Sequence, residues 1–363
     1  NWLLECTPYS GSVDELVHTL AMLGLEVEEV FEPFPSLRPF RVGRIVDCRP
    51  HPEADSLTLC RVDLGEEQPL DIVCGAPNVE PGLHVPVAPA ATELPSGNRV
   101  ERTKIRGRTS EGMILSEREL GLGEDHSGIM VLKEPVSPGT PLLEALGLKD
   151  SILDVEITPN RGDCLSILGI AREVAAFYGL PLYFPPTGLQ QEPPDCADNV
   201  SVSVLDGSAC PLYQARVAEK VHFGTSPDWL RYRLLAMGQR PVNTVVDITN
   251  YVMLETGQPL HAFDLDRLSG PGIRVDRSGS ERDFTTLDGH TRRLSPEDLL
   301  IWDLERPVAL AGIMGGQDTE ISPGSTRLLL ESAVFDPTTI RKTARRLGLS
   351  SESSYRFERG VDQ

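Results

Sequence analysis

The residues best suited to chemistry lie in 237–362, where amide, imidazole, carboxylate and hydroxyl side chains are interleaved with apolar ones. His261 and Asn250 could orient a water molecule for attack on a carbonyl group. Backbone N–H groups near Gly315 and Gly316 could donate to the developing oxyanion, because glycine has no side chain to hold a substrate away. The set therefore indicates a functional site.

Each of these residues also has a structural explanation. His261 could be a hydrogen-bonded loop histidine, and Asn250 could cap the end of a strand. Six or more such groups beside closely spaced glycines are nevertheless hard to explain by packing alone. The chain has no G-x-S-x-G elbow that would indicate a covalent serine. It has no HxxxH pattern or Cys/His cluster either, so we predict no metal site.

Basic charge is concentrated in two stretches. The stretch 99–108 holds five cations and one acidic residue, and 341–346 holds four cations and no acidic residue. Lys104, Arg106 and Arg108 occupy alternate positions, so they would project from one face of a strand and could form a phosphate track. A solvated basic face explains either stretch equally well. Because aromatic platforms are nearly absent between residues 40 and 133, weak shape-based contact with RNA is more plausible there than sequence readout.

The elements that must position these residues follow from local patterns. Ser12 and Glu15 predict a capping box for a helix at 12–23, and a strand at 25–30 follows it. Asp163 is expected to cap a helix that runs to about Tyr178, directly after a strand at 152–157. A further helix is expected at 338–347. Strands are also expected at 200–204 and 215–221.

Between residues 40 and 133 the pattern is entirely β. Short apolar stretches punctuated by glycine and proline predict a small barrel of about five strands. These stretches are 42–46, 57–62, 70–73, 85–88 and 129–132. The overall prediction is an α+β multidomain chain in which an OB-type β-barrel is inserted into a small α/β domain. A mixed α/β domain then follows.

Composition limits the classes of protein that remain. The formal net charge of −20 argues mildly against nucleic-acid binding, although binding depends on a local patch rather than on the whole chain. Seven scattered cysteines without a CxxC pair exclude a disulfide framework and a zinc ribbon, and they favour a reducing, cytoplasmic setting. No apolar run reaches the length of a membrane span, and no signal peptide is found. The chain begins without Met and stops abruptly, so it is expected to be part of something longer.

Two sets of motifs together resemble a known family. His51–Leu57, Cys74–Asn78, Arg106-Gly107 and Ser110–Ser116 occur in the order typical of an EMAP-type tRNA-binding domain, which is an oligonucleotide-binding barrel. The stretches 237–264, 311–316, 331–332 and 353–362 resemble the editing domain of the bacterial phenylalanyl-tRNA synthetase β subunit. The resemblance implies three domains: 1–38 plus 151–190, the barrel at 39–150, and an editing domain at 198–363.

In that family the editing domain hydrolyses tyrosine attached wrongly to phenylalanine tRNA. The resemblance carries catalytic roles to His261, Glu331 and Asn250, with Glu331 accepting a hydrogen bond from the tyrosine hydroxyl. It assigns further substrate contacts to Arg240, Thr249, Gly315, Gly316, Ser351 and Ser353, and tRNA contacts to Lys104, Arg106 and Arg108. Editing is needed because an apolar synthetic pocket rejects an added hydroxyl only about a hundredfold.

The resemblance also predicts what this chain lacks. ATP and Mg²⁺ would be bound by the full enzyme outside this chain, since no P-loop or comparable motif is present, and no cofactor is expected here. The implied partners are tRNA and the synthetase α subunit, in an α2β2 heterotetramer without membrane contact. Two alternatives remain: a tRNA-binding and assembly module whose editing site is degenerate, and a free-standing hydrolase of misacylated tRNA.

Overall fold

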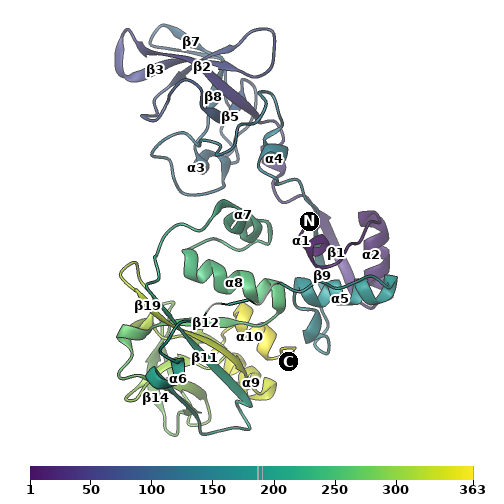
Figure 1. The fold of residues 1–363 in the computed structure, drawn as a ribbon, viewed down its shortest axis with the longest axis vertical. Coiled ribbons are helices and arrows are strands. Elements are labelled where there is room, and N and C mark those ends of the chain that lie inside the picture. The colour runs from purple at the N-terminus through teal and green to yellow at the C-terminus, as the bar shows by residue number, and fades with distance from the viewer. Residues whose placement is uncertain (186–187, 190, 363) are drawn as a thin grey trace. The chain divides into compact units, whose positions relative to one another are not determined.

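The computed structural model describes residues 1–185, 188–189 and 191–362 of the chain (Figure 1). The chain forms two compact units. One comprises 1–29, 153–234 and 240–363, and the other comprises 30–152 and 235–239. No helix among the described residues is both long enough and apolar enough to cross a membrane.

The first unit begins with a small α/β layer. Its elements are α1 (Trp2–Cys6), α2 (Val13–Met22), β1 (Glu26–Phe31), β9 (Ile152–Glu156), a 3₁₀ turn η2 (Gly162–Cys164) and α5 (Ile167–Tyr178). Ser12 and Glu15 form the predicted capping box of α2. Strands β1 and β9 pair directly, so two segments more than 100 residues apart in sequence form one small sheet.

The predicted cap of α5 is wrong. Ser166 caps this helix by accepting a hydrogen bond from the Gly169 N–H, and Asp163 lies in the preceding turn. The carboxylate of Asp163 is held by Arg161 instead, through two hydrogen bonds of 3.1 and 3.0 Å. The 3₁₀ turn η2 separates Asp163 from the helix, so Asp163 lies three residues before the capping residue Ser166.

The rest of the first unit is a mixed α/β arrangement. Its helices are α6 (Cys196–Asn199), α7 (Asp228–Ala236), α8 (Thr244–Thr256), α9 (Pro337–Leu347) and α10 (Glu352–Phe357), with 3₁₀ turns η3 (Leu265–Arg267) and η4 (Gln317–Thr319). Its strands are β10 (Ser201–Val204), β11 (Leu212–Glu219), β12 (Leu260–Asp264), β13 (Gly272–Arg277), β14 (Arg282–Thr285), β15 (Thr291–Leu294), β16 (Leu299–Trp302), β17 (Pro307–Leu310), β18 (Met314–Gly315) and β19 (Arg327–Val334).

These strands form two main sheets around one apolar core. The five-stranded sheet has the order β10-β13-β16-β17-β18, and the three-stranded sheet has the order β11-β19-β12. Strands of both sheets, together with α9 and α10, contribute buried side chains to that core, among them Val275, Leu300, Leu329, Ile340 and Phe357. Burial of this apolar surface is the main force that holds the two sheets together.

The second unit is built around a nearly closed sheet. It contains β2 (Arg41–His51), β3 (Ala54–Asp63), β4 (Leu70–Cys74), β5 (His84–Pro89) and β8 (Gly112–Ile114) in the order β4-β3-β2-β5-β8. A hairpin of β6 (Thr103–Ile105) and β7 (Arg108–Ser110), helices α3 (Glu117–Leu120) and α4 (Leu142–Ala145), and a 3₁₀ turn η1 (Pro35–Leu37) complete it. The N–H of Glu111 donates to the carbonyl of Asp71, which links the two edges of the sheet.

One predicted strand of this unit is wrong. Residues 129–132 form no strand, and β8 is the fifth strand of the sheet. Ile129 is bound through both backbone groups by the side chain of Asn78, at 2.9 Å each. Asn78 thus holds the buried Ile129, whereas Val131 is exposed, and the N–H groups of Met130 and Leu132 donate singly to the carbonyls of Leu115 and His84 without forming a ladder.

Candidate functional site

The three-stranded sheet brings two predicted site residues together from distant parts of the chain. His261 on β12 lies directly opposite Glu331 on the central strand β19, and Glu331 in turn lies opposite Ala215 on β11. Residues in register on neighbouring strands share one face of the sheet, with Cβ atoms about 4.5–5.5 Å apart. The imidazole and the carboxylate therefore lie side by side on the face that covers the main core.

Glu331 is held by a residue that sequence reasoning missed. The hydroxyl of Tyr213, two residues before Ala215 on β11, donates a 2.7 Å hydrogen bond to Oε2 of Glu331. Both side chains are buried. Burial raises the pKa of Glu331 to about 7, although the hydrogen bond from Tyr213 lowers it. Nothing in the local sequence around Tyr213 marks it, because the contact joins residues 118 positions apart.

His261 is in an apolar setting as well. Its ring packs edge-on against Phe263 at 4.5 Å between centroids. A side chain on Gly315 would place its Cβ only 2.6 Å from the Cε1 atom of His261, so this glycine allows β18 to approach the imidazole. The imidazole keeps a partly accessible edge, yet its surroundings remove most of its hydration. This lowers the pKa of His261 to about 4, so the ring is neutral at pH 7.

His261 and Glu331 have hydrogen-bonding atoms without a protein partner among the described residues. Among the residues that the structure describes, neither imidazole nitrogen of His261 has a partner, and Oε1 of Glu331 has none. Polar groups in protein interiors are normally hydrogen-bonded. Two neighbouring groups with unused capacity are therefore suited to a ligand or to water.

Gly316 does not have the predicted role of a donor to the oxyanion. The N–H of Gly316 donates to the carbonyl of Val308 at 2.8 Å, so it is not available to an oxyanion. A side chain at Gly316 would meet that same carbonyl at 2.6 Å. Close packing of β17 against the turn after β18 therefore explains Gly316.

Ser351 and Ser353 hold the loop that leads to Gly315. Ser351 caps α10 and donates its hydroxyl to the carbonyl of Ile313 at 2.8 Å. The Ser353 hydroxyl donates to the carbonyl of Gly312 at 3.3 Å. Both serines thus contact the backbone just before Gly315, with their hydroxyl groups engaged by the protein itself.

Thr249 and Asn250 lie on α8, which packs on the other face of the same sheet (Figure 1). Val245 of α8 is clustered with Ala262 and Leu328, whose side chains alternate with those of His261 and Glu331. The Thr249 hydroxyl donates to the carbonyl of Val246 within the helix. The interpretation of Asn250 as a strand-end cap is wrong, since it is a helical residue. Arg240 lies in the exposed loop before α8.

The predicted strand face with three basic residues does not exist. Arg106 and Gly107 form the turn between β6 and β7, and both have positive φ, at 47° and 80°. Ile105 pairs with Arg108, and Lys104 pairs with Thr109, so Lys104 and Arg108 lie on opposite faces of the hairpin. A single track of the three cations is therefore excluded by the turn.

Two parts of the chain match known protein families. Residues 40–141, which include the nearly closed sheet, match the family described as "Putative tRNA binding domain". Residues 209–363, which include His261, Glu331 and Tyr213, match the family described as "B3/4 domain". Over 362 residues the chain is 55% identical to the phenylalanine–tRNA ligase beta subunit of Nitratidesulfovibrio vulgaris, which covers 100% of this chain and 45% of that protein.

Over its whole length the chain is similar to phenylalanine–tRNA ligase beta subunits. The beta subunit of Oleidesulfovibrio alaskensis is 53% identical over 363 residues, with 100% of this chain and 45% of that protein covered. The chain thus spans a little under half the length of these relatives. A solved N-terminal fragment of the phenylalanyl-tRNA synthetase beta subunit from Pyrococcus horikoshii aligns with 51% of this chain and 56% of its own, at 15% identity and a TM-score of 0.30.

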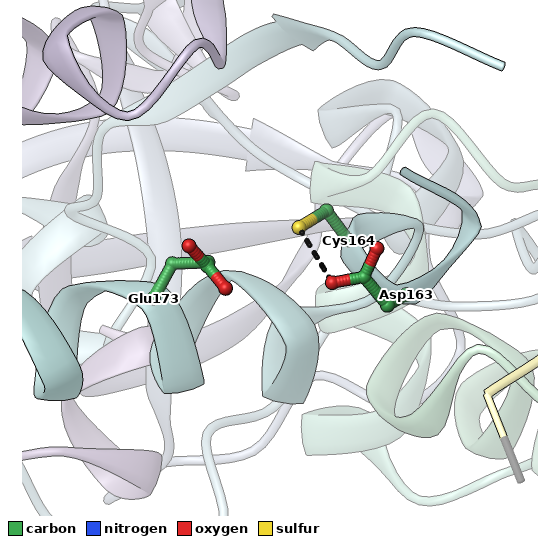
Figure 2. Close-up of side chains that lie close together, drawn as sticks. All are labelled: Asp163, Cys164 and Glu173. Atoms are coloured by element: carbon green, nitrogen blue, oxygen red, sulfur yellow. Dashed lines mark hydrogen bonds between the residues drawn. The ribbon is translucent and has the colours of Figure 1, made fainter. Parts of the chain in front are cut away.

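One further polar cluster in this chain involves possible metal ligands. Ligand atoms of Asp163, Cys164 and Glu173 lie within 4.8 Å of one another (Figure 2). The guanidinium of Arg161 is within 3.0 Å of both carboxylates and donates to the Cys164 sulfur at 2.9 Å. A cation already occupies the centre of this group, so we assign it as an ion-pair network.

The same network adjoins the C-terminal segment of the first unit. A side chain at Gly162 would meet the carbonyl of Gly360 at 2.2 Å, which requires a glycine in this turn. Arg356 donates to the carbonyl of Leu165, and Arg172 pairs with Asp362 at 2.6 Å. The turn after β9 is therefore structural.

Proposed function

We propose that this chain binds tRNA and hydrolyses tyrosine wrongly esterified to phenylalanine tRNA. The observation that carries the proposal is the pairing of His261 with Glu331 on adjacent strands, each with unused hydrogen-bonding capacity. The residues involved fall within the part of the chain that matches the B3/4 family. An ester held here would lie next to a neutral base and a buried acceptor.

The chemistry assigns a role to each group. A water molecule adds to the ester carbonyl carbon, the bond to the ribose oxygen breaks, and that oxygen takes a proton released by the water. Neutral His261 can accept the proton from the water and return it to the ribose oxygen. Asn250 lies on α8, which packs on the other face of this sheet, so the water beside the ester would be oriented by His261 and not by Asn250.

Specificity would come from Glu331. Its Oε2 is taken by Tyr213, and Oε1 can accept the hydroxyl of a tyrosyl group. Phenylalanine would leave this acceptor unpaired, which costs roughly 1–3 kcal/mol. Gly315, Gly316, Ser351 and Ser353 would shape the opposite wall, and Thr249 and Arg240 would contact the RNA end; we propose these six as substrate-binding residues.

The same proposal covers the larger assembly. The unit of residues 30–152 would be an OB-type tRNA-binding domain inserted between the two halves of a small α/β domain. The domain limits would be 1–38 plus 151–190 for the small α/β domain, 39–150 for the tRNA-binding domain and 198–363 for the editing domain. Lys104, Arg106 and Arg108 would contact tRNA from the β6–β7 hairpin. The full enzyme would bind ATP and Mg²⁺ outside this chain and act with an α subunit as a cytoplasmic α2β2 heterotetramer.

The test is deacylation of charged phenylalanine tRNA by the 363-residue chain. Tyrosyl and phenylalanyl esters would be compared for the wild type and for a His261→Ala, Glu331→Ala double variant. We expect selective loss of the tyrosyl ester with the wild type alone. Equal, buffer-level rates for both proteins, repeated with the assembled α and full-length β subunits, would leave a tRNA-binding module as the function.

A further inference from the structure

Helix α9 presents one basic face to solvent. Arg341, Lys342 and Arg345 are exposed and follow an i, i+1, i+4 spacing, which places them together on one side of the helix. The opposite side carries Ile340 and Ala344, which are buried in the main core. The helix is therefore held rigidly by its apolar face while its three cations face outward.

The three cations line a hollow. Its volume is about 290 Å³, and it is lined by Pro337, Thr338, Arg341, Lys342, Arg345 and Glu358. Glu358, the acidic residue of this lining, is paired with Arg359 at 2.8 Å. The carboxylate is thus already matched, and the hollow presents an excess of positive charge.

These cations are unusual within a chain of net charge −20. Among the described residues, none of the three has an ion pair, whereas Arg346 on the same helix is paired with Asp298. A groove on the second unit, of about 440 Å³, also contains arginines, but Arg49 pairs with Asp47 there. Like charges one helical turn apart destabilise a helix by about 0.2–0.5 kcal/mol. The helix dipole favours Arg345, which lies in the last turn, but it does not account for Arg341 and Lys342 earlier in the helix.

We propose that this hollow binds the phosphodiester backbone of an RNA. The three cations extend over ~6 Å along the helix axis, which suits a chain of phosphates better than one small anion. The inference rests on the proposed function, because it supplies a holding point for the RNA whose esterified end is hydrolysed. Helix α9 packs against α10, and the α10 cap Ser351 holds the loop that precedes Gly315. The hollow and the His261–Glu331 pair are thus parts of one packed unit.

The test is the salt dependence of binding to uncharged phenylalanine tRNA. The triple variant Arg341→Gln, Lys342→Gln, Arg345→Gln should bind on the order of tenfold more weakly at low salt. Its slope of log K against log salt concentration should be shallower by about 2, since each phosphate contact contributes roughly 0.7–0.9. Removal of like charges should leave the melting temperature unchanged or raise it, so unfolding would not mimic the effect.

Arg216→Gln is the matched control. Arg216 is an exposed cation on β11 in the same unit, and no ion pair to it is found among the described residues. Loss of the Arg216 charge should change this slope by less than the roughly 0.7–0.9 expected for one phosphate contact. An unaltered slope in the triple variant would overturn the inference.

Deacylation assays distinguish a failure of the RNA-binding inference from a failure of the proposed hydrolysis. With the tyrosyl ester, the triple variant should show a raised KM and an unchanged kcat. A wild-type chain that hydrolyses the ester, beside a variant with unchanged KM and slope, would overturn the RNA-binding hollow alone. A reduced slope in a chain that hydrolyses nothing would overturn the hydrolysis proposal and leave the hollow in place.

Discussion

The hydroxyl of Tyr213 donates a 2.7 Å hydrogen bond to Oε2 of Glu331, and both side chains are buried between the two sheets of the first unit. This contact leaves Oε1 of Glu331 without a partner among the described residues and fixes the carboxylate beside His261. Tyr213 therefore acts through Glu331 as a positioning residue.

Replacement of Tyr213 by Phe should destabilise the protein more at high pH than at low pH. The hydrogen bond lowers the pKa of Glu331, so its loss raises that pKa further and penalises the ionised form. We expect a loss of about 1–3 kcal/mol at pH 8.5 and a smaller loss at pH 5.5. Denaturant unfolding at both pH values measures this. Tyr183→Phe, at a half-exposed tyrosine of the same unit, is the control and should be neutral.

Glu331→Gln should change the pH dependence of stability. The pKa of Glu331 is raised from 4.5 to about 7 in the folded protein. Between these values the folded state holds a proton that the unfolded state has lost, so this group makes stability fall as pH rises. The fall amounts to about 3 kcal/mol at most and is complete above about pH 7. Gln does not titrate, so the stability of the variant relative to wild type should rise by up to that amount from pH 4.5 to 7.

Titration of His261 changes the stability of the fold with pH in the opposite direction. The pKa of His261 is lowered from 6.5 to about 4, so the unfolded state binds the extra proton between these values and stability rises with pH. The two contributions offset each other in the wild type between about pH 4.5 and 6.5. The difference in unfolding free energy between variant and wild type therefore has to be followed against pH. A difference for Glu331→Gln that does not change with pH would contradict a raised pKa of Glu331.

Gly315→Ala should abolish deacylation of the tyrosyl ester while the protein stays folded. The new methyl group would lie 2.6 Å from Cε1 of His261, so the ring has to turn away. The ring end of a side chain can move at modest cost, which is why activity should suffer more than stability. Deacylation rates and melting temperatures measure both effects. Gly324→Ala, at a position with no atom within 4 Å of the added carbon, should leave both unchanged.

The β6–β7 hairpin should show unequal effects of its cations on tRNA binding. Lys104 and Arg108 lie on opposite faces of the hairpin, so one RNA surface cannot contact both of them equally closely. We expect Lys104→Glu and Arg108→Glu to differ by at least about threefold in their effect on affinity, measured by filter binding at fixed salt. Equal losses for the two variants would require a bound RNA that wraps around the hairpin.

Local sequence determined much of this protein. The capping box of α2, the cap of α9 at Asp336 and the glycine stops after α5 and α9 follow from residues within a few positions of each other. The strands that were predicted, β1–β5 and β9–β11, have apolar residues that alternate or cluster where a sheet buries them, whereas β6–β8 and β12–β19 were not predicted. The resemblance to phenylalanyl-tRNA synthetase β subunits was also evident from the sequence, because each motif is a short local run of residues.

The arrangement of the site was decided by tertiary structure. Register between β12 and β19 places His261 opposite Glu331, and β11 adds Tyr213, but the register of strands distant in sequence is set by the packing of whole sheets. The same packing puts Thr249 and Asn250 on the far face of the sheet through α8. Even the local error at Arg106 has this origin. Two residues with positive φ turn the chain back, so a pattern of alternate cations that suits one strand is folded into a hairpin.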